Sequence, residues 1–157
     1  MLDWPWLSAI PSVKEGVQWP GRLEVISTQP LIILDGAHNP HAVAPLVATI
    51  KERYGQLDKQ VLFTCIQTKA IEEMLELWSG LEKSQLTLTT FEDSRAYSVR
   101  DMQEIAHQKG LPYQEWKVFL TQYLERKLQQ SDLLLVTGSL YFLAQVRAFL
   151  IEEISRR

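Results

Sequence analysis

Apolar residues recur along the chain in two alternating patterns: short runs that predict β-strands, and three-to-four-residue spacings that predict helices. The short runs predict strands at residues 23–26, 31–34, 61–66, 86–88, 113–116 and 133–136. The helical spacing predicts helices at residues 43–54, 71–78, 99–110, 118–128 and 140–150. Strands and helices therefore alternate along most of the chain, which is the order expected of a parallel sheet.

The first two predicted strands differ from the others, because only the turn Ser27-Thr28-Gln29-Pro30 separates them. So short a connection predicts an antiparallel hairpin, which places one antiparallel strand at an edge of the sheet. The later strands alternate with helices, so right-handed crossovers should join parallel strands and cover both faces. The sequence thus predicts a three-layer, Rossmann-like α/β fold with a mostly parallel sheet of about six strands.

Capping and turn residues mark several predicted helix boundaries. Asn39 is a favourable N-cap, and Pro40 suits the first helical turn. Pro45 falls inside the same helix, where it should introduce a kink or cost a hydrogen bond. Ser98 is the expected N-cap of a later helix, with Asp101 three residues on as in a capping box.

Composition narrows the class of protein. The chain has 157 residues, 46% of them hydrophobic and 22% charged, with 16 Lys and Arg against 19 Asp and Glu. A net charge of −3 argues against a nucleic-acid-binding domain, which is usually basic. Apolar runs fall well short of the ~20 residues of a membrane span, and the N-terminus lacks the pattern of a signal peptide. The single cysteine, Cys65, excludes an internal disulfide and is compatible with the cytoplasm, where we expect the protein.

Residues 1–20 differ from the rest of the chain. They hold three of the five tryptophans and three of the seven prolines, a density of proline that prevents one long helix. We interpret this segment as a linker with one short helix, whose aromatic residues pack against something outside the chain.

The residues best suited to binding or catalysis follow predicted strands, where open parallel sheets bind ligands. Asp35-Gly36-Ala37-His38-Asn39-Pro40 joins a strand to a helix whose free N–H groups favour an anion. Thr137-Gly138-Ser139-Leu140-Tyr141 has the same placement, and Trp19-Pro20-Gly21-Arg22 enters the hairpin. Each has a structural alternative: a strand-to-helix turn, an N-cap serine and a solvated arginine, respectively. If Arg22 lies near Asp35, the two charges should pair in the absence of ligand.

Other segments favour structural roles. Gln67-Thr68-Lys69 and Asp93-Ser94-Arg95 also follow strands but are typical of ordinary polar loops. Cys65 lies in an apolar run and is expected to be an inert core thiol. His41 and His107 are expected to be solvated, and no cluster of His and Cys predicts a metal site. The sequence also lacks the glycine-rich phosphate-binding loops, so a nucleotide site would have to be completed by residues outside this chain.

Three strings, WPGRLE at 19–24, DGAHNP at 35–40 and TGSLY at 137–141, resemble the C-terminal domain of folylpolyglutamate synthase/dihydrofolate synthase, in the Mur ligase family. The resemblance covers residues 4–151, and SRAYS at 94–98 is similar to a further loop of that family. Residues 67–71 depart from it, because only Lys69 remains of a usually Lys- and Asp-rich loop.

The resemblance implies an ATP-dependent ligase that activates a carboxylate as an acyl phosphate, which the amino group of L-glutamate then attacks. Arg22 resembles the arginine that touches the ATP phosphates, and Asp35 the aspartate that holds the ribose. His38 and Ser139 resemble residues near the incoming glutamate. The resemblance places the phosphate-binding loop, the catalytic groups and the Mg²⁺ ligands in an N-terminal domain, so none is expected in this chain.

On this interpretation residues 1–19 end a missing N-terminal ATPase domain, and residues 20–157 form a glutamate-binding domain that closes over ATP and is inactive alone. Folate or dihydropteroate would contact the missing domain, and neither nucleic acid nor membrane is an expected partner. One alternative is a stand-alone amino-acid- or nucleotide-binding module that retains the fold. Another is a ligase of cell-wall precursors, against which DGAHNP favours the folate branch.

Overall fold

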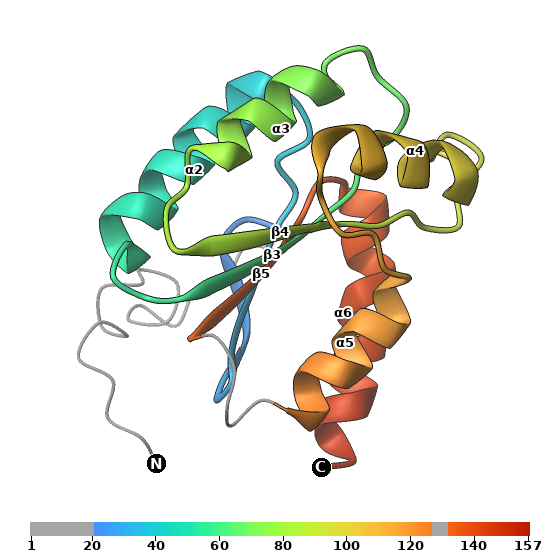
Figure 1. The fold of residues 1–157 in the computed structure, drawn as a ribbon. Helices are drawn as coiled ribbons and strands as arrows, with labels where there is room; N and C mark the ends of the chain where they lie inside the picture. The colour runs from blue at the N-terminus through green and yellow to red at the C-terminus, as the bar shows by residue number, and fades with distance from the viewer. Residues whose placement is uncertain (1–20, 127–131) are drawn as a thin grey trace.

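A computed structural model describes residues 21–126 and 132–157. A five-stranded sheet forms its centre, in the order β1-β2-β5-β3-β4 (Figure 1). The strands are β1 (Glu24–Thr28), β2 (Leu31–Asp35), β3 (Lys59–Phe63), β4 (Ser84–Leu88) and β5 (Leu133–Thr137). The helices are α2 (Pro40–Tyr54), α3 (Ile71–Ser79), α4 (Val99–Lys109), α5 (Trp116–Glu125) and α6 (Leu140–Ser155).

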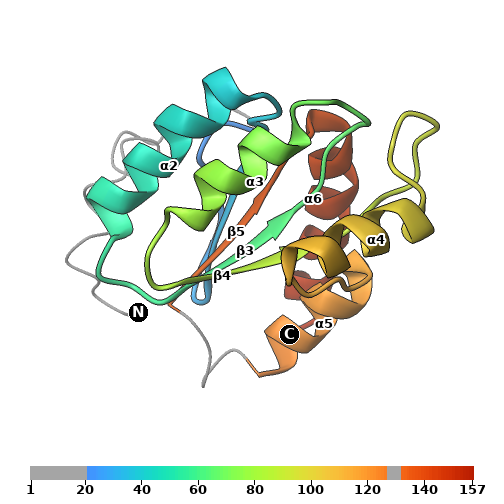
Figure 2. The same ribbon diagram turned by 45° about the horizontal axis from the view of Figure 1, so that its top comes forward.

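The topology confirms the predicted α/β class. β1 pairs antiparallel with β2 at one edge, and the other three pairings are parallel. β5 is the last strand in the sequence, yet it lies between β2 and β3 (Figure 2). Every β2 residue from Leu31 to Asp35 is in register with the β5 residue from Leu133 to Thr137.

The predicted strand at 113–116 is wrong. Tyr113 forms a single isolated bridge with Leu88, and Trp116 begins α5. The reason is the capping residue Glu115, whose carboxylate accepts hydrogen bonds from the amides of Lys117 and Val118 and turns the backbone into a helix. The described sheet therefore has five strands, where the sequence pattern predicts about six.

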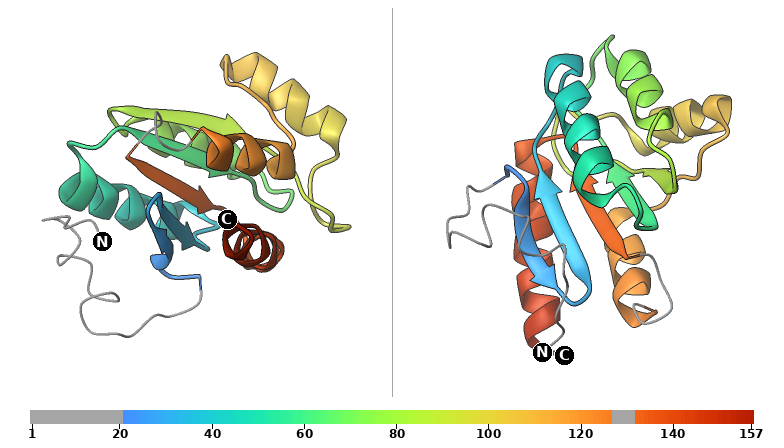
Figure 3. Two further views of the ribbon diagram at one scale, coloured as in Figure 1. Left: turned by 90° about the horizontal axis from the view of Figure 1, so that it is seen from below. Right: turned by 90° about the vertical axis from the view of Figure 1, so that its left-hand side faces the viewer.

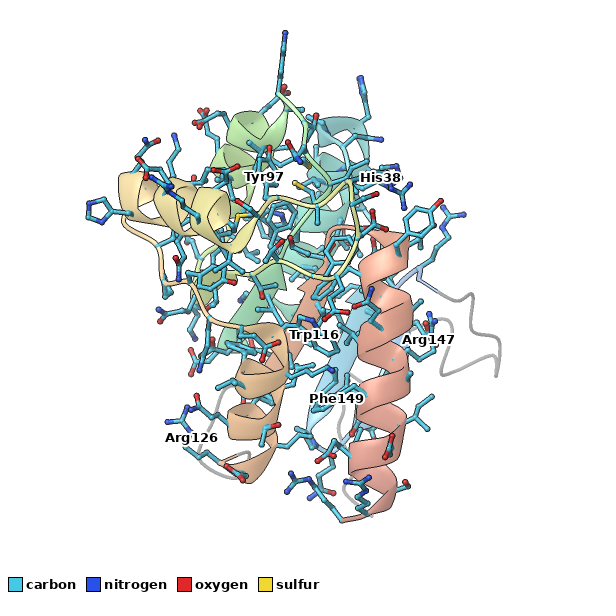
Figure 4. The ribbon with its side chains drawn as sticks, turned by 90° about the vertical axis from the view of Figure 1, so that its right-hand side faces the viewer. His38, Tyr97, Trp116, Arg126, Arg147 and Phe149 are labelled. Carbon is cyan, nitrogen blue, oxygen red and sulfur yellow. The ribbon has the colours of Figure 1, made fainter. Side chains whose placement is uncertain are left out.

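Alternating side chains of the strands build two cores, one on each face. Leu31, Ile33 and Leu135 lie in the core under α2, α3 and α4, whereas Ile32 and Leu134 face the core under α5 and α6. Figure 3 shows α2 and α6 on opposite sides of the sheet. Within the second core Trp116 packs edge-on against Phe142 and Phe149, at 5.9 and 5.5 Å between ring centroids (Figure 4). The three predicted layers are therefore present.

Helix α2 bears out the predicted cap and accommodates its internal proline. The side chain of Asn39 accepts from the amide of Ala42 at 2.9 Å, and Pro40 occupies the first turn. Pro45 is exposed and does not interrupt the helix. The backbone N–H that proline lacks is therefore missing on the solvent side of the helix. In the described part of the chain, α6 and the other helices are too short or too polar to cross a membrane.

Candidate functional site

The candidate site lies at what we call the carboxyl edge, where the parallel strands end at Asp35, Thr137, Phe63 and Leu88. Asp35 is paired with Thr137, and Thr137 is paired with Phe63. The loops that follow β2, β5 and β3 are therefore neighbours, as the predicted topology requires. In Figure 4, His38 and Tyr97 lie at this end of the sheet.

The carboxylate of Asp35 organises the turn that follows β2. Its Oδ1 accepts from the amide of Ala37 at 2.9 Å, and its Oδ2 accepts from the amide of Leu23 at 3.0 Å. Burial raises the pKa of Asp35 above its usual value, while these two hydrogen bonds and the charge of Arg22 oppose the increase. Asp35 therefore joins two loops, and it is a half-buried acid whose pKa is raised.

Arg22 lies beside Asp35 without pairing with it. Although both residues are described, no ion pair joins them, and the carboxylate is satisfied by backbone amides instead. The expected pairing is therefore wrong. The guanidinium of Arg22 is exposed at the rim of the site, where a ligand could meet it.

His38 is exposed at the start of α2 with one ring nitrogen engaged. Its Nδ1 lies 2.9 Å from the carbonyl oxygen of Gly36. Because a carbonyl oxygen only accepts, this contact assigns the ring hydrogen to Nδ1 and leaves Nε2 facing outward. Nε2 is therefore the ring nitrogen of His38 that this contact leaves unused.

Leu140, at the start of α6, packs against two glycines of different loops. A Cβ atom at Gly21 would lie 2.5 Å from Leu140 Cδ2, and one at Gly36 would lie 2.4 Å from the same atom. The amide of Gly36 also donates to the carbonyl oxygen of Gly21 at 2.6 Å. The described parts of the three strings therefore meet at Leu140, whose side chain fits because positions 21 and 36 are glycines.

The loop between β5 and α6 is closely packed. Gly138 has φ 132°, and a Cβ atom there would lie 1.4 Å from the carbonyl oxygen of Thr64. Ser139 is only 4% exposed, and its hydroxyl oxygen accepts from the amide of Tyr141 at 3.2 Å as the N-cap of α6. The structure thus gives Ser139 the structural role of an N-cap, the alternative that the sequence left open. Its hydroxyl hydrogen is still available to donate.

A cavity of about 500 Å³ opens between the hairpin and α2. Arg22, Asp35 and His38 line its polar side, and its apolar wall is made by Leu23, Ala42, Pro45, Leu46 and Leu140. The structure therefore brings Arg22, Asp35 and His38 together around one cavity, and Ser139 does not line it.

A fixed arginine is the group that the sequence interpretation missed. Arg95 donates from Nε and Nη2 to the two carboxylate oxygens of Asp93, at 2.9 and 2.8 Å. Its guanidinium carbon also lies 4.0 Å from the ring centroid of Tyr141, next to the Ser139 loop. This ion pair lowers the pKa of Asp93 to about 2. The string SRAYS was the available signal, but the periodicity around it indicates only a polar loop.

The loop after β3 is tied to the SRAYS loop. The amide of Gln67 donates to the carbonyl oxygen of Arg95 at 2.8 Å, and the Tyr97 hydroxyl donates to the carbonyl oxygen of Thr68 at 2.8 Å. Lys69 extends from this loop and is exposed. The two polar loops therefore form one unit that holds Arg95 at the carboxyl edge.

The remaining candidates have the structural roles that the sequence predicts. Cys65 is fully buried, and burial raises the pKa of its thiol to about 12. His41 and His107 are exposed on helices. Within the described ranges, no group of three His, Cys, Asp or Glu side chains could hold a metal ion. Trp19 and Pro20 lie outside the described residues, as does the linker predicted at 1–19.

Comparisons with known proteins agree with this geometry. The family model "Mur ligase, glutamate ligase domain" matches residues 21–140. A dihydrofolate synthase/folylpolyglutamate synthase of Bacillus subtilis (strain 168) is 29% identical over 129 residues, which are 82% of this chain and 30% of the relative. This chain therefore spans under a third of that protein.

Solved structures show the same relationship. A bifunctional folylpolyglutamate synthase/dihydrofolate synthase from Yersinia pestis c092, complexed with AMPPNP and Mn ion, superposes with a TM-score of 0.68 at 27% identity, over 87% of this chain and 32% of that one. Another structure of such an enzyme, with Mn, AMPPNP and L-glutamate bound, gives a TM-score of 0.68 at 27% identity, over 85% of this chain and 32% of that one. The chain therefore belongs to the Mur ligase family, as a C-terminal domain of the folylpolyglutamate synthase/dihydrofolate synthase enzymes.

Proposed function

We propose that this domain serves an ATP-dependent amide ligase that adds L-glutamate to folate or to dihydropteroate. The observation that carries the proposal is that residues 21–23, residues 35–38 and Leu140, which belong to the three strings, line one cavity, with Arg22, Asp35 and His38 on its polar side. The domain closes over ATP, binds glutamate and is inactive alone.

The proposed reaction has two steps. The γ-phosphoryl group of ATP passes to a carboxylate oxygen of the folate substrate, which gives an acyl phosphate and ADP. The amino nitrogen of glutamate then attacks the acyl carbon and displaces phosphate, and the nitrogen loses a proton as the amide forms. Because water would hydrolyse the acyl phosphate, the reaction needs a site that closes.

The nucleotide end of the site is assigned to Arg22 and Asp35. The exposed guanidinium of Arg22 suits the phosphate oxygens, which it can bind in a bidentate manner. Asp35 has both oxygens already accepting from amides, but each retains a lone pair for a ribose hydroxyl. Magnesium would neutralise the phosphates when bound. The described residues contain no cluster to hold it, so we assign its ligands to another domain.

The glutamate end is assigned to His38, Ser139 and Arg95. Nε2 of His38 is free to accept from the amino group of glutamate, and the Ser139 hydroxyl can donate to a carboxylate. The guanidinium of Arg95 is oriented by Asp93 and Tyr141. A fixed guanidinium of this kind suits a carboxylate of an anionic amino acid.

A stand-alone binding module is the weaker alternative, because the relatives reported above are folylpolyglutamate synthase/dihydrofolate synthase enzymes and this chain spans only part of them. The fully buried thiol of Cys65 and the absence of disulfides in the sequence suit the reducing cytoplasm, where we place the reaction. Folate or dihydropteroate would bind outside this domain.

The test is ATP- and glutamate-dependent phosphate release by the whole ligase that contains this chain, with folate and dihydropteroate supplied separately. We expect release with at least one of them, and none from the 157-residue chain alone. An Arg22→Ala variant should raise the KM for ATP far more than the KM for the folate substrate. Phosphate release by the isolated chain that Arg22→Ala abolishes would contradict the proposal.

A further inference from the structure

The turn that carries Arg22 has a strained backbone. Gly21 has φ 76°, and Leu23 has φ 46°, a left-handed conformation that is unfavourable for a residue with a side chain. Such a turn persists only when surrounding contacts hold it. The contacts that hold Gly21 and Leu23 therefore also set the position of Arg22 between them.

Two of these contacts come from the DGAHNP loop. The amide of Leu23 donates to Asp35, and the carbonyl oxygen of Gly21 accepts from the amide of Gly36. Both act on one side of the turn. They hold the turn against β2 but do not connect it to α6.

The third contact comes from Glu24, directly after the turn. Its Oε1 accepts from the amide of Gly21 at 3.0 Å. The same carboxylate accepts from Arg147 on α6, with Nη2 at 2.6 Å from Oε1 and Nε at 3.1 Å from Oε2. The side chains are 13% and 27% exposed, so this two-bond ion pair is largely shielded from water. Figure 4 shows Arg147 on α6, partway along the helix.

We propose that Glu24, held by Arg147, is a positioning residue for Arg22: it fixes the Gly21 end of the turn and links it to the helix that begins at the Ser139 loop. The inference rests on the proposed function, since it assigns the turn to ATP binding. Glu24 itself does not line the cavity, so it would act on a ligand there only through the turn. Loss of its carboxylate should therefore weaken ATP binding while leaving glutamate binding intact.

A purely structural role is the competing explanation, in which the ion pair only ties β1 to α6. The two roles differ at the Gly21 amide. An ion pair of reversed polarity would still tie the strand to the helix, but the side chain of an arginine at position 24 has no atom that accepts a hydrogen bond. The reversed pair therefore restores the link and not the turn.

The experiment uses the whole ligase with Glu24→Met, and with Glu72→Met as the matched control. Glu72 forms an exposed ion pair with Lys109, outside the cavity that Arg22 lines. We expect Glu24→Met to raise the KM for ATP, and the Kd for ATP measured by calorimetry, about tenfold, as expected for the loss of charge-assisted hydrogen bonds. The kcat and the KM for glutamate should stay within about twofold, and Glu72→Met should change none of these values.

The double variant Glu24→Arg/Arg147→Glu separates the two explanations. We expect it to recover the melting temperature while its KM for ATP stays raised. Recovery of both would overturn the positioning role, as would an unchanged KM for ATP in Glu24→Met. If Glu24→Met does not fold, Arg147→Met replaces it, with an expected increase of about threefold in the KM for ATP because Gly21 keeps its acceptor.

Amide hydrogen exchange keeps this inference separable from the proposed function. We expect Glu24→Met to speed exchange at Gly21 in the 157-residue chain, with exchange in β2 and β5 unchanged. Unchanged exchange at Gly21 would overturn the positioning role whatever the enzyme does. If exchange at Gly21 becomes faster but the whole ligase does not use ATP, the positioning of the turn would be supported and its assigned ligand rejected.

Discussion

The carboxylate of Asp35 accepts a hydrogen bond from the backbone amide of Leu23, across 3.0 Å and between two loops that are 12 residues apart. Leu23 has a left-handed backbone, so the bond restrains a conformation that the chain would otherwise leave. The same carboxylate caps the amide of Ala37 in its own loop. Asp35 is therefore part of the framework of the site as well as a candidate ligand of the ribose.

Asp35→Ala should lower the free energy of unfolding of the 157-residue chain by about 2–4 kcal/mol, because two backbone amides lose a charged acceptor. Arg22→Ala should leave the free energy of unfolding nearly unchanged, since its side chain is exposed. Urea denaturation of both variants measures the difference. Equal stability of the two variants would contradict the framework role of Asp35.

Gly138→Ala should destabilise the chain by about 4 kcal/mol or more, because the new methyl group would overlap the carbonyl oxygen of Thr64. Gly80→Ala is the matched control: a Cβ atom there meets its nearest neighbour, the Leu77 carbonyl oxygen, at an ordinary 3.5 Å. Thermal melts of both variants test this. A Gly138→Ala variant that melts with the control would show that the loop can move apart at no cost.

Arg95→Met should raise the KM for L-glutamate of the whole ligase about tenfold, through loss of a carboxylate partner, and leave the KM for ATP unchanged. Arg100→Met provides the control, because Arg100 is also exposed but lies on α4. Initial rates at varied glutamate and then at varied ATP give both constants. A rise in the KM for ATP alone would assign Arg95 to the other end of the site.

Cys65 should not react with a disulfide reagent such as DTNB in the native chain, since its thiol is fully buried with a pKa of about 12. In urea it should react at the rate of a free thiol. The absorbance of the released thiolate follows both reactions. Rapid labelling of the native chain would show that the core around β3 opens.

The stability conferred by Glu24 should depend on pH. Burial raises the pKa of Glu24, but hydrogen bonds from Arg147 and Gly21, together with the Arg147 charge, outweigh it and leave the pKa below its ordinary value of 4.5. A lowered pKa means that the carboxylate stabilises the fold above the unfolded pKa and that this is lost as the pH falls through the folded pKa. Glu24→Gln should therefore cost about 2 kcal/mol at neutral pH, and this cost should shrink as the pH falls through the folded pKa of Glu24.

Much of the fold could be predicted from the sequence because the two periodicities are strong. The alternation along β2 and β5 sends successive residues into the two cores. The pattern fails where local chemistry decides, as at Glu115, whose cap starts a helix where apolar residues indicate a strand. It also extends the strand at 61–66 too far, because Cys65 is buried beyond the point where β3 ends at Phe63.

The site was predictable only in part. Turn chemistry placed Asp35 and His38 at the carboxyl edge, because Asp35 ends a strand and His38 lies in the turn after it. Side-chain partners were not predictable, since the amides that satisfy Asp35 belong to Leu23 and Ala37 rather than to Arg22. The pairing of Glu24 with Arg147 joins residues 123 positions apart, so no local pattern could indicate it.

The position of β5 bears on how the chain is made. Among the strands that the structure describes, β5 alone joins the β1–β2 hairpin to the β3–β4 pair, and it follows all four of them in the sequence. Until Leu133–Thr137 has been synthesised, no strand pairing joins the two halves of the sheet. The sheet should therefore complete its folding only after β5 emerges, so a nascent chain that stops short of residue 133 would be a substrate for chaperones and proteases.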